Sequence, residues 1–95
     1  MIDLKEKHLA MVRAILQEWL PGVEVRAFGS RVTGKSKPYS DLDLAIISDE
    51  KIPSRTMAHL SADFTDSDLP FRVDITERRK IKDFEIEPTE VIWGR

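Results

Sequence analysis

The chain has 95 residues, which is the size of one domain, so we expect a single domain over residues 1–95. Apolar residues make up 41% and charged residues 34%, a balance typical of globular proteins and not of disordered tails. The net charge of -2 argues against sequence-independent binding of nucleic acid, which needs a surplus of cations. The absence of cysteine excludes a disulfide scaffold, a thiolate nucleophile and cysteine-ligated zinc.

The expected location and the expected kind of site also follow from these features. The first residues are charged and no long apolar run follows, so the sequence predicts neither an export signal nor a membrane span. Without cysteine the chain suits a reducing compartment, and we expect it in the cytoplasm. A chain this short has little surface for a deep pocket of its own, so we expect a functional site that is shared with a partner or with another copy.

Hydrophobic spacing predicts the elements of the first half. Apolar residues at three- and four-residue steps predict an amphipathic helix over residues 4–20, with Asp3 and Glu6 in a capping arrangement at its start. Alternation predicts a strand over 23–28 that ends at Gly29-Ser30. Residues 31–40 read as a basic loop with one helical turn after Ser30. The apolar run 41–47 predicts a central strand that is covered on both faces.

The second half continues the mixed pattern. Pro53 suits the first turn of a helix that carries Met57, Leu60 and Phe64. A loop over 65–70 and an alternating strand over 71–75 follow, then a short basic helix over 78–84, and we expect residues 91–93 to dock on the body. The expected order is α-β-(α)-β-α-β-α, an α+β fold with a small mixed sheet and flanking helices.

Three aspartates are candidates for a metal site. Asp41 and Asp43 point to the same face of their strand, about 7 Å apart at the Cα atoms. Asp74 is a polar residue between two core positions of the third strand, so the three carboxylates converge if the third strand pairs beside the second. Carboxylates that lie this close together need cations, and with no cysteine the expected ions are Mg²⁺ or Mn²⁺.

A second candidate feature lies at the end of the first strand. A glycine at position 29 lets the backbone approach a ligand, and Ser30 is able to cap a helix or donate to a phosphate oxygen. Arg31, Lys35 and Lys37 add positive charge in the same loop. Backbone donors and cations beside paired carboxylates suit phosphoryl or nucleotidyl transfer.

The spacing of these residues resembles a known signature. Gly29-Ser30, ten intervening residues and Asp41-Leu42-Asp43 resemble the GS-x10-DxD pattern of the nucleotidyltransferase superfamily that includes DNA polymerase β, and the short length resembles its minimal nucleotidyltransferase (MNT) branch. Gly34 and the segment 69–74 are similar to further parts of the family pattern, and the resemblance extends from the first helix to about residue 75. The loop 35–39 departs from it.

The resemblance implies a polymerase β palm-like fold and an assignment of roles. Gly29 and Ser30 would hold the β- and γ-phosphates of ATP. Two Mg²⁺ ions would bind at Asp41 and Asp43, and Asp74 would share the second ion and help to activate an acceptor hydroxyl. The implied nucleotide-binding residues are Gly29, Ser30, Arg31 and Ser40; the implied catalytic and metal-binding residues are Asp41, Asp43 and Asp74.

The resemblance also implies a partner. Small MNT proteins are often paired with a helical HEPN protein, as antitoxins that transfer AMP from ATP to a tyrosine of the toxin. On that basis we expect a cytoplasmic adenylyltransferase antitoxin that assembles with a HEPN-type toxin or with itself. We expect no membrane and no direct nucleic-acid contact.

Alternatives remain open for several of these features. The chain could instead be a binding module that neutralises its partner by occlusion without turnover, whereas an enzyme that modifies small molecules would need a further substrate-binding domain. Arg31 could be an ordinary surface cation, and Lys35 and Lys37 suit a solvated loop. Asp66 and Asp68 also form a DxD pair, but their place before Pro70 indicates a turn or the end of a helix. Base preference, acceptor and oligomeric state are not predicted.

Overall fold

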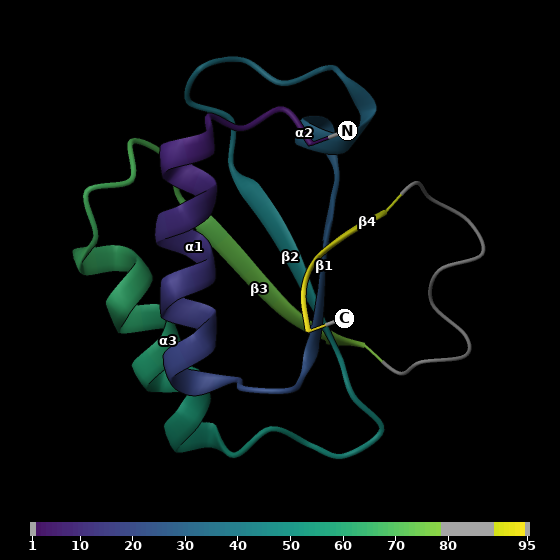
Figure 1. The fold of residues 1–95 in the computed structure, drawn as a ribbon, viewed down its shortest axis with the longest axis vertical. Coiled ribbons are helices and arrows are strands. Elements are labelled where there is room, and N and C mark those ends of the chain that lie inside the picture. Colours follow the sequence, from purple (N-terminus) through teal and green to yellow (C-terminus); the bar gives the residue numbers. More distant parts are fainter. Residues whose placement is uncertain (1, 79–88, 95) are drawn as a thin grey trace.

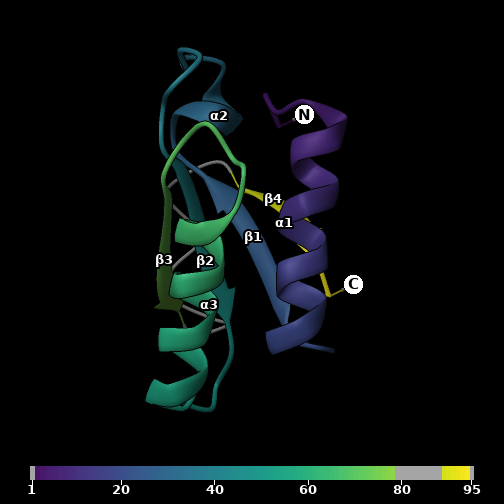
Figure 2. The ribbon, with the colours of Figure 1, turned by 90° about the vertical axis from the view of Figure 1, so that its left-hand side faces the viewer.

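A mixed β-sheet with two long helices on one face organises the chain in the computed structural model (Figures 1 and 2). The structure describes residues 2–78 and 89–94. Within them the element order is α1 (Glu6–Trp19), β1 (Glu24–Phe28), α2 (Ser30–Thr33), β2 (Leu42–Ile47), α3 (Ser54–Asp66), β3 (Val73–Arg78) and β4 (Glu90–Trp93). The α+β class and the small mixed sheet are as expected from the sequence.

The strands lie in the spatial order β3-β2-β1-β4 across the described part of the sheet. β1 pairs antiparallel with both β2 and β4, and β2 pairs parallel with β3. A parallel pair needs a crossover, and α3 supplies it. In this order β2 is an inner strand, and all its residues except Asp43 are buried. The prediction of a central strand covered on both faces is therefore confirmed.

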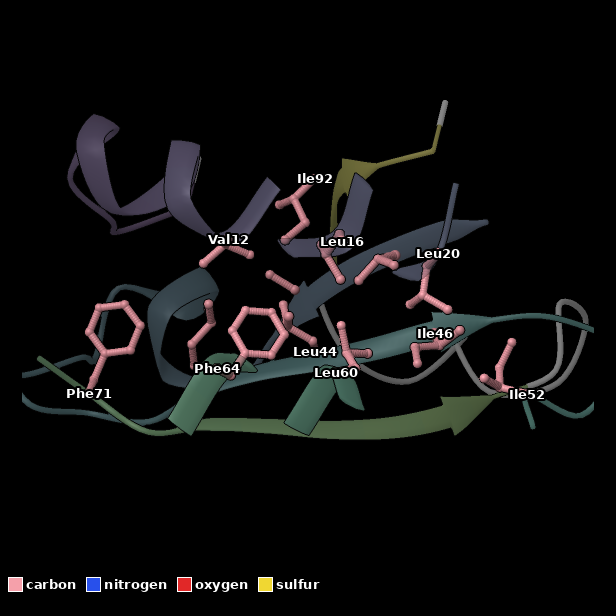
Figure 3. Close-up of a cluster of buried hydrophobic side chains, with 13 residues drawn as sticks. Val12, Leu16, Leu20, Leu44, Ile46, Ile52, Leu60, Phe64, Phe71 and Ile92 are labelled. Atoms are coloured by element: carbon pink, nitrogen blue, oxygen red, sulfur yellow. The ribbon is translucent and has the colours of Figure 1, made fainter. Parts of the chain in front are cut away.

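The core lies between the sheet and the two long helices, which pack side by side (Figures 2 and 3). Helix α1 has the predicted apolar stripe, and α3 has one that faces the same sheet. Strand β2 alternates, so that Leu42, Leu44 and Ile46 join this core while Asp43 lies on the opposite face. The main contributors are Val12, Leu16, Leu20, Val25, Leu44, Ile46, Leu60, Phe64 and Ile92.

The start of α1 differs from the prediction. Lys5 is the N-cap residue, without a side-chain capping hydrogen bond. Asp3 lies outside the helix, where its carboxylate accepts a hydrogen bond from the Ser36 hydroxyl and its backbone N–H donates to the Arg31 carbonyl. The expected capping role of Asp3 and Glu6 is wrong, because the distant loop supplies a better partner for the Asp3 carboxylate.

The second half of the chain brings further corrections. Helix α3 runs to Asp66 and takes up two residues of the expected loop, while β3 begins at Val73 and runs to Arg78. A helix beginning at Arg78 is therefore wrong, since pairing with β2 keeps this residue extended beside Ile47; the rest of that expected helix lies outside the described residues. Residues 91–93 do dock on the body, but as part of strand β4.

Among the described residues, no helix has both the length and the apolar character needed to cross a bilayer.

Candidate functional site

Three segments of the predicted motif meet at the end of the sheet where α2 lies, at the top of Figure 1. Strand β1 ends there and turns directly into α2, and β2 and β3 both begin there. The register places Asp43 between Phe28 of β1 and Asp74 of β3. The antiparallel and parallel pairings of β2 therefore bring the Gly-Ser turn, the DxD pair and the third carboxylate to one place.

Gly29 lies against the Asp43 carboxylate. Its φ of 80° and ψ of -156° lie in a region that essentially only glycine adopts. A Cβ atom at this position would lie 2.4 Å from the Asp43 Oδ2 atom, which is closer than atoms of this kind approach. The turn after β1 thus needs glycine both for its backbone shape and for room beside the Asp43 carboxylate.

The carboxylates share one face of the sheet. Leu42 and Leu44 enter the core, so their neighbours Asp41 and Asp43 lie on the face away from α1 and α3. Asp74 pairs with Asp43 across the parallel strands, at the usual strand spacing of about 4.8 Å. The side chains of Asp41 and Asp74 are 42% and 48% exposed, so a ligand in solution has access to both.

Arg72 is part of this group, and sequence reasoning did not single it out. Its Nη2 atom lies 3.4 Å from Asp41 Oδ2 and 3.7 Å from Asp74 Oδ2. The backbone explains the position, because the Leu42 N–H donates to the Arg72 carbonyl at 2.9 Å and sets Arg72 beside Asp41. The sequence does contain a signal for this position: side chains of a strand alternate between its two faces, so Arg72, two residues before Asp74, shares the face of Asp74.

Asp41, Asp43 and Asp74 carry the oxygen ligands that a hard divalent cation prefers, and the strand register sets these residues next to one another. Three carboxylates occupy adjacent positions on one face, and Gly29 leaves space at the Asp43 oxygen. As the side chains lie, however, no three acidic, histidine or cysteine residues in the described ranges are gathered closely enough to hold a metal ion. The Arg72 guanidinium lies beside two of the carboxylates, so an ion that uses both must displace it.

The two serines of the predicted site lie close to the same turn. Ser30 is the first residue of α2, and its carbonyl accepts the Lys35 N–H at 3.1 Å. The Ser40 hydroxyl accepts the Lys37 N–H at 2.7 Å and so closes the loop that leads to Asp41. The structure thus places both serines next to the carboxylate group, one on each side of the loop.

Arg31 lies away from solvent. Its side chain is among the buried ones, with 6% of the residue exposed. It donates hydrogen bonds to three backbone carbonyls, those of Asp3, Pro38 and Ser40. This environment differs from that of an ordinary surface cation, because each nitrogen atom of the guanidinium already donates to a carbonyl.

The remaining candidate residues are exposed to solvent. Lys35 and Lys37 are exposed, in line with a solvated loop. Asp66 ends α3 and Asp68 follows it, both exposed. This agrees with the helix-end and turn interpretation of the second DxD pair.

A cavity of about 480 Å³ opens between the start of α1 and the loop 36–39. His8, Tyr39 and Phe71 line it, and the His8 and Phe71 rings meet edge to face with centroids 5.7 Å apart. Burial, then the charges of Lys7, Lys5 and Arg31, lower the pKa of His8 below its ordinary value. The cavity therefore has an aromatic wall next to a histidine that favours its neutral form.

Comparison with known sequences agrees with this geometry. The sequence pattern described as "Nucleotidyltransferase domain" matches residues 9–92. A protein of Haemophilus influenzae named "Probable protein adenylyltransferase MntA" is 51% identical over 76 residues, which are 80% of this chain and 67% of that protein.

Two solved structures share the fold. One is described as a toxin-antitoxin with AMP-PNP, with a TM-score of 0.64 and 17% identity over 92% of this chain and 73% of that chain. The other is an aspartate-to-glutamate double mutant of the toxin-antitoxin MntA-HpeT, with a TM-score of 0.62 and 16% identity over 97% and 75%. From its sequence pattern, and from its identity with the Haemophilus protein, this chain belongs to the nucleotidyltransferase domain family, in the MNT branch of the polymerase β-like superfamily.

Proposed function

We propose that the chain is a Mg²⁺-dependent adenylyltransferase that moves AMP from ATP to a tyrosine hydroxyl of a HEPN-type toxin and thereby acts as an antitoxin. The observation that carries the proposal is the contact of Gly29 with the Asp43 carboxylate, with Asp74 in register beside Asp43. This arrangement places a backbone segment that a ligand can approach closely beside a set of carboxylates. Nucleotidyl transfer needs both features.

The relatives support the finer parts of the proposal. The Haemophilus protein carries the name of a protein adenylyltransferase, and its identity of 51% is high enough to expect a related activity. The two structural neighbours are toxin-antitoxin structures, one of them with an ATP analogue. ATP as the donor and a toxin as the acceptor are therefore the substrates to test first.

In the proposed mechanism, Gly29 and Ser30 bind the β- and γ-phosphates, with the Ser30 hydroxyl as a donor. Asp41, Asp43 and Asp74 hold two Mg²⁺ ions, which supply positive charge against the triphosphate when they are bound. Ser40 contributes through the loop that it closes before Asp41. Arg31 is buried and hydrogen-bonded to carbonyls, so the proposed mechanism gives it no contact with phosphate.

The chemistry is an in-line substitution at the α-phosphorus. Asp74 accepts the proton of the tyrosine hydroxyl, whose oxygen forms a bond to the α-phosphorus. The bond from the α-phosphorus to the oxygen bridging it to the β-phosphorus breaks, and pyrophosphate leaves with that electron pair. The products are an adenylylated tyrosine and pyrophosphate. The exposure of Asp74 gives a protein acceptor access to it.

The decisive experiment follows the label from ATP. The purified chain is incubated with Mg²⁺ and a lysate of its native cells, with ATP labelled at the α-phosphate in one sample and at the γ-phosphate in another. We expect label on a protein band from the α-position only, and mass spectrometry should find AMP on a tyrosine. Transfer of γ-label would indicate a kinase and contradict the proposal.

The matched control replaces Asp41 and Asp43 by Asn in one variant. Asparagine keeps the size of each side chain and removes the charge, so the fold should remain and transfer should be lost. Retained transfer in this variant would contradict the carboxylate mechanism. If the variant lost transfer yet still neutralised the toxin as well as the wild type, the chain would instead be an occluding module.

A further inference from the structure

Arg31 is the buried charged residue of the described chain, and its surroundings are unusual for a cation. Its Nε, Nη1 and Nη2 atoms donate to the carbonyls of Ser40, Asp3 and Pro38 at 3.0, 2.9 and 3.2 Å. Its guanidinium carbon lies 4.3 Å from the centre of the Phe71 ring. In the described ranges, no carboxylate is within ion-pair distance of this side chain.

Burial of a charge without a counter-ion is costly, so it persists only where hydrogen bonds compensate for the lost water. Three carbonyl dipoles and an aromatic face provide that compensation here. The planar guanidinium has donors that point in several fixed directions, and a lysine ammonium has no such fork. The site therefore needs arginine for its geometry and not for its charge alone.

The segments joined by Arg31 are the ones that must be aligned for the proposed chemistry. Arg31 follows Ser30 directly in the chain, and Ser40 directly precedes Asp41. A single side chain thus connects the Gly-Ser turn with the DxD pair across the loop between them. Pro38 has no N–H group to donate. Within the loop, a backbone hydrogen bond runs from the Ser40 N–H to the Lys37 carbonyl. Arg31 therefore fixes the second part of the loop, while the Lys35 N–H and the Ser36 hydroxyl fix its start by donating to the Ser30 carbonyl and the Asp3 carboxylate.

We propose that Arg31 is a positioning residue: it holds the loop 35–40 against α2 and so sets the Asp41 carboxylate relative to Ser30, without touching the nucleotide. This inference rests on the proposed function, because it assumes that Asp41 holds a metal ion. It assigns the arginine that follows the Gly-Ser pair to the alignment of the site, whereas the resemblance implied contact with nucleotide.

The test measures Mn²⁺ affinity without nucleotide, by isothermal titration, in the wild type and in Arg31→Lys. We expect the variant to bind Mn²⁺ about tenfold more weakly or worse, as is typical when a residue behind a metal ligand is changed. In the label-transfer assay, kcat should fall more than the KM for ATP rises. Lys35→Gln, which removes an exposed cation of the same loop, should keep the wild-type Mn²⁺ affinity.

A phosphate contact predicts the opposite pattern. Lysine would then substitute in part for arginine, Mn²⁺ affinity would not change, and Arg31→Gln would raise the KM for ATP. That result would overturn the inference. If the Arg31 variants do not fold, Phe71→Leu removes the aromatic face beneath the guanidinium, and the positioning role predicts weaker Mn²⁺ binding there as well; unchanged binding in a folded Phe71→Leu variant would also overturn it.

The outcomes separate this inference from the proposed function. A wild type that binds no Mn²⁺ contradicts the proposed metal site, and the inference is then overturned with it. A wild type that binds Mn²⁺ while Arg31→Lys binds equally well overturns the inference alone and leaves the proposed function in place.

Discussion

At the scale of single residues, the site is built from backbone geometry as much as from charged side chains. Gly29 has a conformation reserved for glycine and lies against Asp43, while Gly34, at the end of α2, has a left-handed conformation with open space around it. The two glycines therefore separate two effects of an added methyl group: backbone strain alone at Gly34, and strain plus a collision with a carboxylate at Gly29.

Gly29→Ala should lower stability by about 2–3 kcal/mol, whereas Gly34→Ala should lower it by about 1 kcal/mol. The difference arises because the new Cβ at position 29 must push the Asp43 carboxylate away. Urea unfolding of both variants measures it. Label transfer should be lost in Gly29→Ala and retained in Gly34→Ala; equal stabilities and equal transfer would contradict the importance of the contact.

Arg72 should compete with a divalent cation, because its guanidinium lies beside the Asp41 and Asp74 carboxylates. Arg72→Gln should therefore bind Mn²⁺ about two- to fivefold more tightly, which is the range expected from an exposed ion pair worth up to about 1 kcal/mol. Arg55→Gln, an exposed arginine on α3, is the matched control and should bind as the wild type does. Weaker Mn²⁺ binding in Arg72→Gln would show that the arginine supports the metal site.

At the scale of elements, the long helices and the first two strands follow from local patterns, and β4 does not. Four residues are too few to show a clear alternation, so the sequence indicated docking of residues 91–93 and not a strand. In the structure β4 pairs with β1, Ile92 enters the core at 3% exposure, and the Trp93 indole N–H donates to the Leu20 carbonyl. This short strand thus closes one side of the core.

Ile92→Ala should destabilise the protein by about 2–4 kcal/mol, the usual cost of a large-to-small change in a core. Val91 lies on the opposite face of the strand and is half-buried, so Val91→Ala should cost less than about 1 kcal/mol. The midpoints of urea unfolding give both values. Similar losses for the two variants would mean that β4 contributes by its backbone pairing and not by the Ile92 side chain.

At the scale of the whole molecule, one hydrophobic cluster joins α1, α3 and the sheet. The radius of gyration is 12.5 Å, close to the value of about 12 Å for a single domain of this length. The carboxylate group lies at one end of the sheet and on the face away from the helices. The part of the chain that provides stability is thus largely separate from the carboxylates to which the chemistry is proposed to belong.

A single cluster of this kind should unfold in one cooperative step. The prediction of one domain is tested by following urea unfolding with far-UV circular dichroism and with tryptophan fluorescence. Trp19 reports on the contact of α1 with α3, through its bond to Asp63, and Trp93 reports on β4. We expect coincident midpoints; two separate transitions would contradict a single domain.

The sequence by itself determined the features that depend on local spacing. The helical periodicity of residues 4–20, the alternation of 23–28, and the order of the Gly-Ser pair and the DxD pair are all properties of neighbouring residues, so they could be read without the structure. The likeness of that spacing to a family signature also indicated the fold class and the expected chemistry.

Only the tertiary structure decided which distant residues meet. The register of β2 with β3 sets Asp43 beside Asp74 and Arg72 beside Asp41, and a shift by one residue would have turned these side chains to the other face. The burial of Arg31 depends on carbonyls from the N-terminal segment and from its own loop, so its local sequence could not distinguish a buried side chain from an exposed one. The pairing of β4 with β1 likewise depends on a partner more than 60 residues away. These contacts arise from packing of the whole chain, and local patterns do not contain them.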